Sequence, residues 1–229
     1  MPHLYSADHP LHAQSLKDKQ RRLRDGFAPP LTLRVHRALS WLLRAEQETD
    51  DEDVRFILLW IGFNAAYAGD ISQASGEDGR TERERFLEFF HTMVRFDSTH
   101  RLYDACWDRF TSEIRLLLNN RYVYAAFWLH QNGYAGYSNW DLRLADEWRQ
   151  ISKALAAHDT ATLLSKLFDR LYVLRNQLVH GGGTWNSSVN REQVEGCSAL
   201  LGCLLPIFID LMMDNPGHDW SMPHYPVVD

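Results

Sequence analysis

An arginine, an asparagine and a histidine stand together near the end of a predicted helix, in the segment RNQLVH (residues 175–180). Asn176 and His180 are four residues apart and so share one helix face, and the long side chain of Arg175 can reach toward the same place. An imidazole can transfer protons, and a guanidinium can hold a phosphate through two hydrogen bonds without a metal ion. The segment therefore predicts a site for acid–base chemistry on a phosphate ester.

The same segment also has a purely structural interpretation. His and Arg side chains at helix ends often cap carbonyl groups or pair with carboxylates, and glycine runs such as Gly181-Gly182-Gly183 often end helices. In the catalytic interpretation, these three glycines leave room for a bulky ligand to approach the backbone beside His180. The residues alone leave both interpretations open.

The helix that must position this segment is marked by a stripe of leucines. Six leucines recur at helical spacing between Leu163 and Leu178, within a helix predicted over residues 160–180. A second helix, over residues 54–68, is almost wholly apolar and is expected at the centre of the fold. Within it, Asn64 is interpreted as a core amide that fixes helix packing; the alternatives are a direct catalytic part and support of Arg175 or His180.

The rest of the chain shows helical periodicity as well, and no strand-like alternation continues over five residues. The predicted fold is all-α, an antiparallel helical bundle of about seven or eight helices. Three segments are expected: a polar N-terminal arm (residues 1–30), one helical domain (31–214) and a C-terminal tail (215–229). Further helices are predicted from about residue 33 and over residues 81–96, 101–118, 121–130, 142–157 and 191–213.

Composition narrows the function classes. The formal net charge of −6 excludes a protein that coats nucleic acid by bulk electrostatics, so any RNA contact must be local. The basic cluster over residues 17–24 is interpreted as a solvated arm or short helix, with a nucleic-acid contact as the alternative. Three cysteines without a CxxC pair indicate buried thiols in a reducing cytosol. We therefore expect a cytoplasmic protein.

Membrane spans, metal ions and cofactors are not expected. No uncharged apolar run reaches about 18 residues, and the longest candidate, residues 197–213, contains Pro206 and Asp210 and is interpreted as a buried helix. The histidines form no HExxH or HxxxH pair, and no glycine-rich nucleotide-binding motif is present. His218 and His224, which flank Trp220 in the tail, are interpreted as surface residues.

The segment LRNQLVHGG (residues 174–182) resembles the signature of the HEPN superfamily, an Arg–polar pair followed by His. The apolar helix, with LWIGFNAAY over residues 59–67, is similar to the branch often called Apea-like, and the NREQVEG helix fits the same pattern. The similarity spans about residues 35–213. In the branch paired with nucleotidyltransferase antitoxins, a Tyr that becomes modified follows two residues after the motif His; here that position is Gly182.

The resemblance implies a helical bundle that dimerises and brings two copies of the motif helix together. Many members are metal-independent endoribonucleases in toxin–antitoxin, phage-defence or RNA-processing systems, whereas others have lost catalysis. It implies that Arg175 and His180 are the essential pair, that Asn176 supports them, and that the ribose 2′-OH of RNA is the nucleophile. The expected partners are RNA, a second copy of the chain, and an antitoxin or regulatory protein. The alternative is an inactive module that binds RNA, a nucleotide or a protein.

Overall fold

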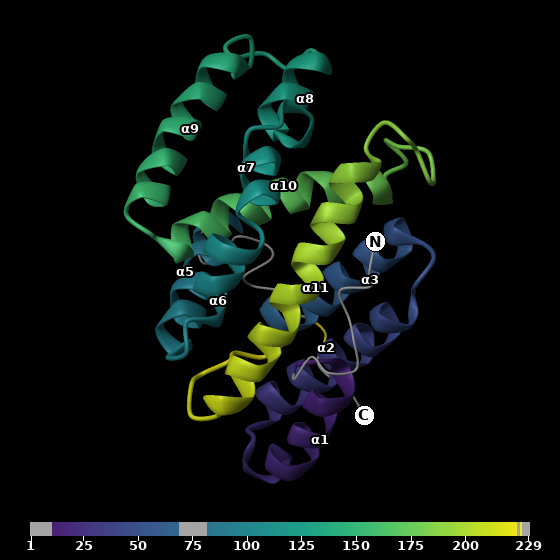
Figure 1. Ribbon diagram of the computed structural model, residues 1–229, viewed down its shortest axis with the longest axis vertical. Helices are drawn as coiled ribbons and strands as arrows, with labels where there is room; N and C mark the ends of the chain where they lie inside the picture. Colours follow the sequence, from purple (N-terminus) through teal and green to yellow (C-terminus); the bar gives the residue numbers. More distant parts are fainter. Residues whose placement is uncertain (1–10, 69–81, 224, 226–229) are drawn as a thin grey trace. The chain divides into compact units, whose positions relative to one another are not determined.

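The computed structural model describes residues 11–68, 82–223 and 225, and its regular structure is helical throughout (Figure 1). This described part contains ten α-helices and no strand, which confirms the predicted all-α class. Two differences raise the count above the predicted seven or eight. The basic cluster in the N-terminal arm lies in a helix of its own, and the helix predicted over residues 101–118 is broken into two.

The chain forms two compact units. The first consists of residues 1–81 and 194–229, and the second of residues 82–193. The predicted division into an arm, one domain and a tail stays a prediction.

The first unit is built from α1 (Ala13–Leu23), α2 (Pro29–Gln47), α3 (Glu52–Tyr67) and α11 (Arg191–Asp214) from its fourth residue onward. A short connection lets α2 and α3 pack along one another. The carboxylate of Asp51 caps α3 by accepting the Val54 N–H at 3.0 Å, and Glu52 and Asp53 follow in the first turn, where the helix dipole favours acidic residues. Trp60 is 3% exposed but Val54 is 39% exposed, so α3 buries one face and not the whole circumference that its apolar sequence had predicted.

The long helix α11 is the apolar centre of the first unit. Every residue from Leu200 to Met213 is buried, and Phe208 packs on Phe63 of α3 with ring centroids 6.1 Å apart. By length and composition α11 could also cross a membrane, but 89% of its most apolar window is buried inside the protein. It therefore has the burial of a core helix, as predicted for residues 197–213.

The N-terminal basic cluster and the C-terminal tail both pack into this unit. Lys19 lies 2.6 Å from both Asp210 and Asp214, so α1 is held to the end of α11. The buried guanidinium of Arg34 donates to several carbonyl oxygens of the α3 end and the tail, those of Ala66, Ala68, Trp220, Ser221 and Met222. Burial without a carboxylate lowers the pKa of Arg34 to about 10. Trp220 is also buried, His218 is half-buried, and His224 lies outside the described residues.

The second unit surrounds one central helix, α10 (Thr160–Val179), which packs against α5 (Glu82–Phe96), α7 (Thr111–Leu118) and α9 (Trp140–Ala156). Five leucines of its predicted stripe are buried, and Leu178 near the helix end is half-buried. The Phe168 ring packs at a tilt against Phe90 of α5, with centroids 4.7 Å apart. The leucine stripe thus fixes which face of the motif helix is turned to the core. The first residue of the helix predicted over residues 81–96 lies outside the described residues.

The helix predicted over residues 101–118 is interrupted by a π-helical segment. It consists of α6 (Arg101–Asp104), the π segment η2 (Ala105–Arg109) and α7. The Phe110 N–H bonds to the Ala105 carbonyl, five residues back. Within this segment, Trp107 contacts the stretch between α9 and α10. Its indole N–H donates to Thr160, and its ring meets His158 edge-on. These contacts come from residues about fifty positions away, so local periodicity could not show the break.

Candidate functional site

The predicted motif lies at the exposed end of α10. Arg175 and Asn176 are half-buried, and His180, which ends the helix as its C-cap residue, is exposed. The Arg175 guanidinium donates to the Asn176 side-chain oxygen at 2.9 Å. With the other described residues Arg175 makes no ion pair, and the imidazole of His180 has no hydrogen bond. The guanidinium therefore keeps donors for a ligand, and the imidazole is open to solvent.

The glycines after His180 form the helix cap. Gly181 has φ +70°, the Gly182 N–H bonds to the Gln177 carbonyl at 2.7 Å, and the Gly181 N–H bonds to Leu178. This pattern is a Schellman motif, which satisfies the last carbonyl groups of a helix. A Cβ atom on Gly182 would lie 3.3 Å from the Gln177 carbonyl oxygen. The structural interpretation of Gly181 and Gly182 is therefore confirmed, and the cap fixes His180 at the point where the helix stops.

A hydrogen bond that the sequence did not indicate joins the motif helix to the next part of the unit. The Gln177 side-chain amide donates to the carbonyl of Tyr122 at 2.6 Å, and the Trp128 indole N–H donates to the same oxygen at 2.7 Å. Tyr122 lies in the short 3₁₀ turn η3 (Arg121–Val123), and Trp128 lies in α8 (Ala125–Gln131). One carbonyl thus connects α10, η3 and α8.

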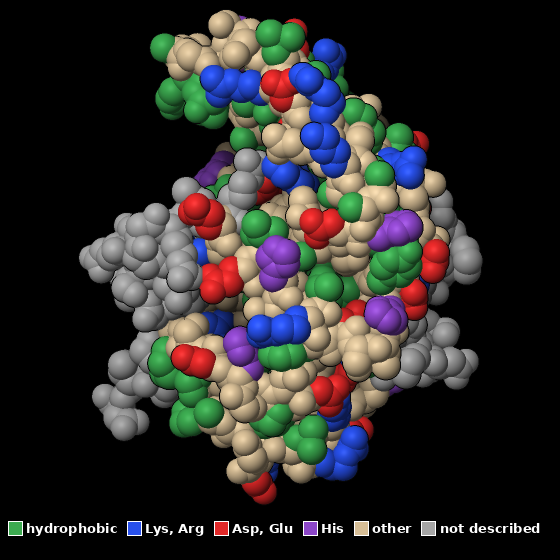
Figure 2. All heavy atoms as spheres, turned by 90° about the vertical axis from the view of Figure 1, so that its left-hand side faces the viewer, with side chains coloured by type: hydrophobic (Ala, Val, Ile, Leu, Met, Phe, Trp, Pro, Cys, Tyr) green, Lys and Arg blue, Asp and Glu red, His purple; other side chains and the backbone are tan. Residues whose placement is uncertain are grey.

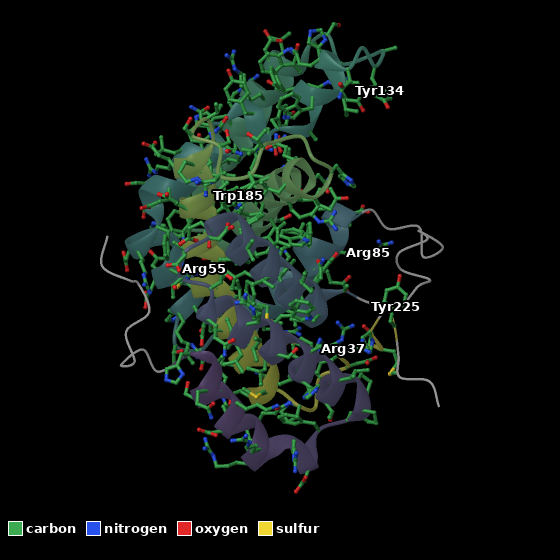
Figure 3. The ribbon with its side chains drawn as sticks, turned by 90° about the vertical axis from the view of Figure 1, so that its right-hand side faces the viewer. Arg37, Arg55, Arg85, Tyr134, Trp185 and Tyr225 are labelled. Carbon is green, nitrogen blue, oxygen red and sulfur yellow. The ribbon has the colours of Figure 1, made fainter. Side chains whose placement is uncertain are left out.

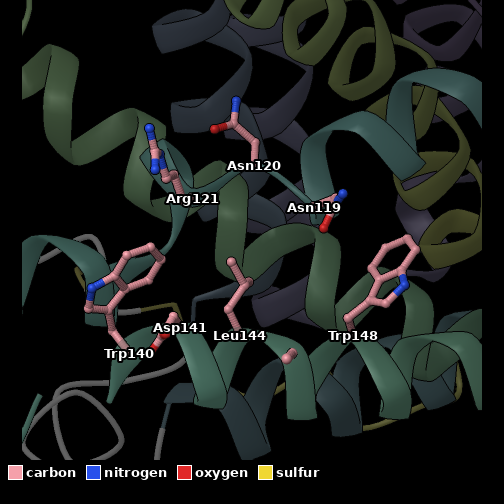
Figure 4. Close-up of a pocket in the computed structure, with 8 residues that line it drawn as sticks. Asn119, Asn120, Arg121, Trp140, Asp141, Leu144 and Trp148 are labelled. Atoms are coloured by element: carbon pink, nitrogen blue, oxygen red, sulfur yellow. The ribbon is translucent and has the colours of Figure 1, made fainter. Parts of the chain in front are cut away.

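Beside this turn lies a pocket between η3 and α9, which we call the tryptophan pocket (Figure 4). Its volume is about 530 Å³, within the usual range of small-molecule sites. Trp140 and Trp148 stand at its two ends with Leu144 between them, and Arg121 and the two asparagines lie on the opposite wall. The lining residues are Asn119, Asn120, Arg121, Trp140, Asp141, Leu144, Ala145 and Trp148.

Buried charges hold α9 and α10 together next to this pocket. Glu147, one residue before Trp148, lies 3.2 Å from Lys166 and 3.4 Å from Arg170, both on α10. Arg170 also lies over the ring of Tyr124, 4.6 Å from its centroid, and donates to the Leu118 carbonyl. Because Glu147 and Arg170 are buried, their ion pair holds α9, and with it both tryptophans, against the motif helix.

The surface around the pocket combines aromatic and basic side chains. Figure 2 shows Lys and Arg side chains gathered over the end of the second unit where Figure 1 places α8 and α9. Figure 3 shows Tyr134 on the loop between these helices, and it is exposed; Trp185, on the loop that follows α10, is exposed farther from the pocket. Arg143 lies over the Tyr137 ring, 5.1 Å from its centroid. Aromatic and basic residues in this mixture are typical of single-stranded nucleic-acid surfaces.

The sequence interpretation missed these aromatic residues. Trp140, Leu144 and Trp148 are spaced four apart, which places them on one helix face, so their shared orientation was readable. What the spacing could not show is that the opposite wall comes from η3, about twenty residues earlier in the chain.

Asn64 lies on α3, in the first unit, and is half-buried. Its side-chain amide makes no hydrogen bond with the other described residues, so the satisfied core amide expected there is not observed among them. Its predicted support of Arg175 or His180 stays a prediction.

The residues described contain no group of three or more His, Cys, Asp or Glu side chains placed to hold a metal ion. The three cysteines are buried, as predicted for thiols of the core. Comparison with known proteins finds no matching family model, no matching curated protein and no matching solved structure.

Proposed function

We propose that this protein is a metal-independent endoribonuclease of HEPN type, with Arg175, Asn176 and His180 as its active-site residues. One observation supports this most. At the end of α10 an exposed imidazole follows a guanidinium whose one hydrogen bond to the described residues is to Asn176. An arginine with a purely structural role is expected to donate its hydrogen bonds to carboxylates or carbonyls, as Arg34 does. Arg175 keeps most of its donors available.

In the proposed reaction, the imidazole of His180 takes the proton of a ribose 2′-OH. The oxygen then attacks the neighbouring phosphorus, and the bond from phosphorus to the 5′-oxygen breaks. A second imidazole, from the same position of a partner subunit, gives its proton to the leaving oxygen. Arg175 stabilises the negative charge on the phosphorus oxygens, and Asn176 orients Arg175 by accepting its hydrogen bond. The products are a 2′,3′-cyclic phosphate and a 5′-hydroxyl.

The two-histidine scheme requires a homodimer formed through α10. The face of this helix that carries Asn176 also exposes Tyr172 and Val179, whose exposed fractions are 41% and 50%. These three residues are spaced by four and three positions and therefore lie on one side of the helix. An exposed apolar side beside the motif is the surface that a dimer through this helix would bury.

The HEPN resemblance also supports a role in a toxin–antitoxin or phage-defence system in the cytoplasm, with an antitoxin or regulatory protein as a further partner. The second candidate function is a catalytically inactive module that binds RNA, a nucleotide or a protein. The tryptophan pocket is the observation that favours this candidate, because it would bind a ligand without any chemistry at His180.

The test is cleavage of single-stranded RNA by purified protein in EDTA, with analysis of the product ends. We expect His180→Ala to lower the rate by about 10²–10⁴-fold and Arg175→Ala to lower it by at least about 10²-fold. His91→Ala, an exposed histidine on α5, and Arg44→Ala, an exposed arginine on α2, are the matched controls and should cleave normally. Cleavage that needs Mg²⁺, or that survives both motif substitutions, would place the chemistry elsewhere.

A further inference from the structure

We propose that the tryptophan pocket is a nucleobase subsite, in which bases of single-stranded RNA stack on Trp148 and on Trp140. This inference rests on the proposed function for the identity of the strand. The pocket itself lies outside the RNQLVH motif and shares no residue with it.

The two indoles offer the flat apolar faces on which bases stack. Trp140 is supported from behind by Phe127, which meets it edge-on with ring centroids 5.0 Å apart. Trp148 has no ring contact with the other described residues, and neither indole N–H has a hydrogen-bond partner among them. By contrast, the indole N–H groups of Trp107 and Trp128 each donate a hydrogen bond within the protein. The pocket tryptophans therefore have both a face and a donor to give to a ligand.

The polar groups of the pocket fit the edge of a base. The side chains of Asn119 and Asp141 make no hydrogen bond with the described residues, so an amide and a carboxylate are available as donor and acceptor. A carboxylate disfavours a phosphate at the same place but accepts N–H groups from a base. Arg121, at the rim, donates to the Tyr122 hydroxyl at 3.0 Å and has further donors for a backbone phosphate. The base therefore enters the pocket while the phosphate stays at the rim.

The position of the pocket argues for the substrate strand as its occupant. Arg121 is followed directly by Tyr122, whose carbonyl oxygen accepts the hydrogen bond from Gln177 of the motif helix. A strand that crosses η3 is thus held by a turn that is fastened to the helix carrying Arg175 and His180. A protein segment fits less well, because Leu144 and Ala145 are the only aliphatic side chains of the lining.

The experiment measures binding separately from cleavage. A fluorescently labelled single-stranded RNA whose riboses are 2′-O-methylated cannot be cut by 2′-OH attack, and its affinity is followed by anisotropy. We expect Trp148→Ala to weaken binding at least about fivefold, the lower end for loss of one base–aromatic stack. Trp148→Phe should recover part of the affinity. Leu142→Ala, an exposed residue on the same helix outside the lining, should bind as the unsubstituted chain does.

The outcomes separate this inference from the proposed function. Affinity that depends on Trp148, in a protein that cuts no RNA, would support the subsite and remove the nuclease. Normal cleavage with an unchanged KM and unchanged affinity in Trp148→Ala would keep the nuclease and overturn the subsite. Unchanged RNA affinity combined with loss of self-association in Trp148→Ala would assign the pocket to a protein contact and would also overturn the subsite. Failure of the unsubstituted protein to bind the RNA would overturn it as well.

Discussion

The side-chain amide of Gln177 and the backbone carbonyl of Tyr122 are hydrogen-bonded across 2.6 Å, which fastens the end of the motif helix to the turn that carries Arg121. The same carbonyl accepts the indole N–H of Trp128. Gln177 lies between Asn176 and His180 in the chain but turns away from them to a structural partner. The motif therefore contains one residue that fastens η3 to the motif helix.

Replacing Gln177 by Leu should separate positioning from stability. The Tyr122 carbonyl keeps its bond to Trp128, so the loss in unfolding free energy should be about 1 kcal/mol, the usual worth of one hydrogen bond. Because η3 is then less firmly held, the KM for RNA should rise more than kcat falls. Urea unfolding and steady-state cleavage measure the two effects, with Gln131→Leu at an exposed position of α8 as the control. A fall in kcat alone would contradict a positioning role.

Gly181→Ala should destabilise the second unit by about 1–2 kcal/mol, because φ +70° is unfavourable for a residue with a Cβ atom. Gly181→Asn should cost less, since Asn adopts this conformation more readily. Gly26→Ala is the control: no atom lies within 4 Å of its added Cβ and its φ is not positive. Thermal or urea unfolding followed by circular dichroism gives the differences; equal stability of all three variants would refute the cap.

Arg34→Met should destabilise the first unit more than any of the substitutions above destabilises the second. It removes a buried cation that several carbonyl groups use as their donor, and each carbonyl left unsatisfied costs about 1–3 kcal/mol. Arg44→Met removes an exposed i,i+4 ion pair with Glu48 and should cost at most about 0.5 kcal/mol. Limited proteolysis should show faster cleavage near Trp220 in Arg34→Met. Similar losses in both variants would mean that the tail does not depend on Arg34.

The buried thiols give a pH-dependent prediction. Burial raises the pKa of Cys197 far above its usual value of about 9. The folded chain therefore keeps a proton that the unfolded chain releases, and this contribution to stability is present below about pH 9 and is lost as the pH rises above it. A disulfide reagent at pH 8–9 should find no reactive thiol until denaturant is added. Rapid reaction of the native protein would contradict the burial.

Val179→Lys should weaken the proposed dimer, because it places a charge on the exposed apolar side of α10. Light scattering at tens of micromolar should then show a shift from dimer to monomer, together with loss of RNA cleavage. Leu116→Lys, at a still more exposed apolar position on α7, is the control and should change neither self-association nor cleavage. If the unsubstituted protein is a monomer throughout this range, the two-histidine scheme is wrong.

The limits of prediction from sequence can be seen in particular residues. The leucine stripe correctly indicated the buried face of α10, because burial repeats with the period of the helix. The break at Ala105 and the wall formed by Arg121 were not predicted, since both depend on residues about twenty to fifty positions away. The motif was found because its three residues lie within one helix turn and a half. Its fastening to Tyr122 was not, because a glutamine in a helix gives no sign of its distant partner.

The division of the chain into units has a consequence for synthesis on the ribosome. Residues 82–193 form one continuous unit, so its core can close as soon as this stretch has been translated. The first unit needs most of α11 and the carbonyl groups around Trp220, which are translated after the second unit. Until then the apolar faces of α2 and α3 lack α11, the helix that covers Phe63. We expect the nascent chain to be most prone to chaperone binding or aggregation during this interval. Both can be measured on a nascent chain whose translation is arrested near residue 193.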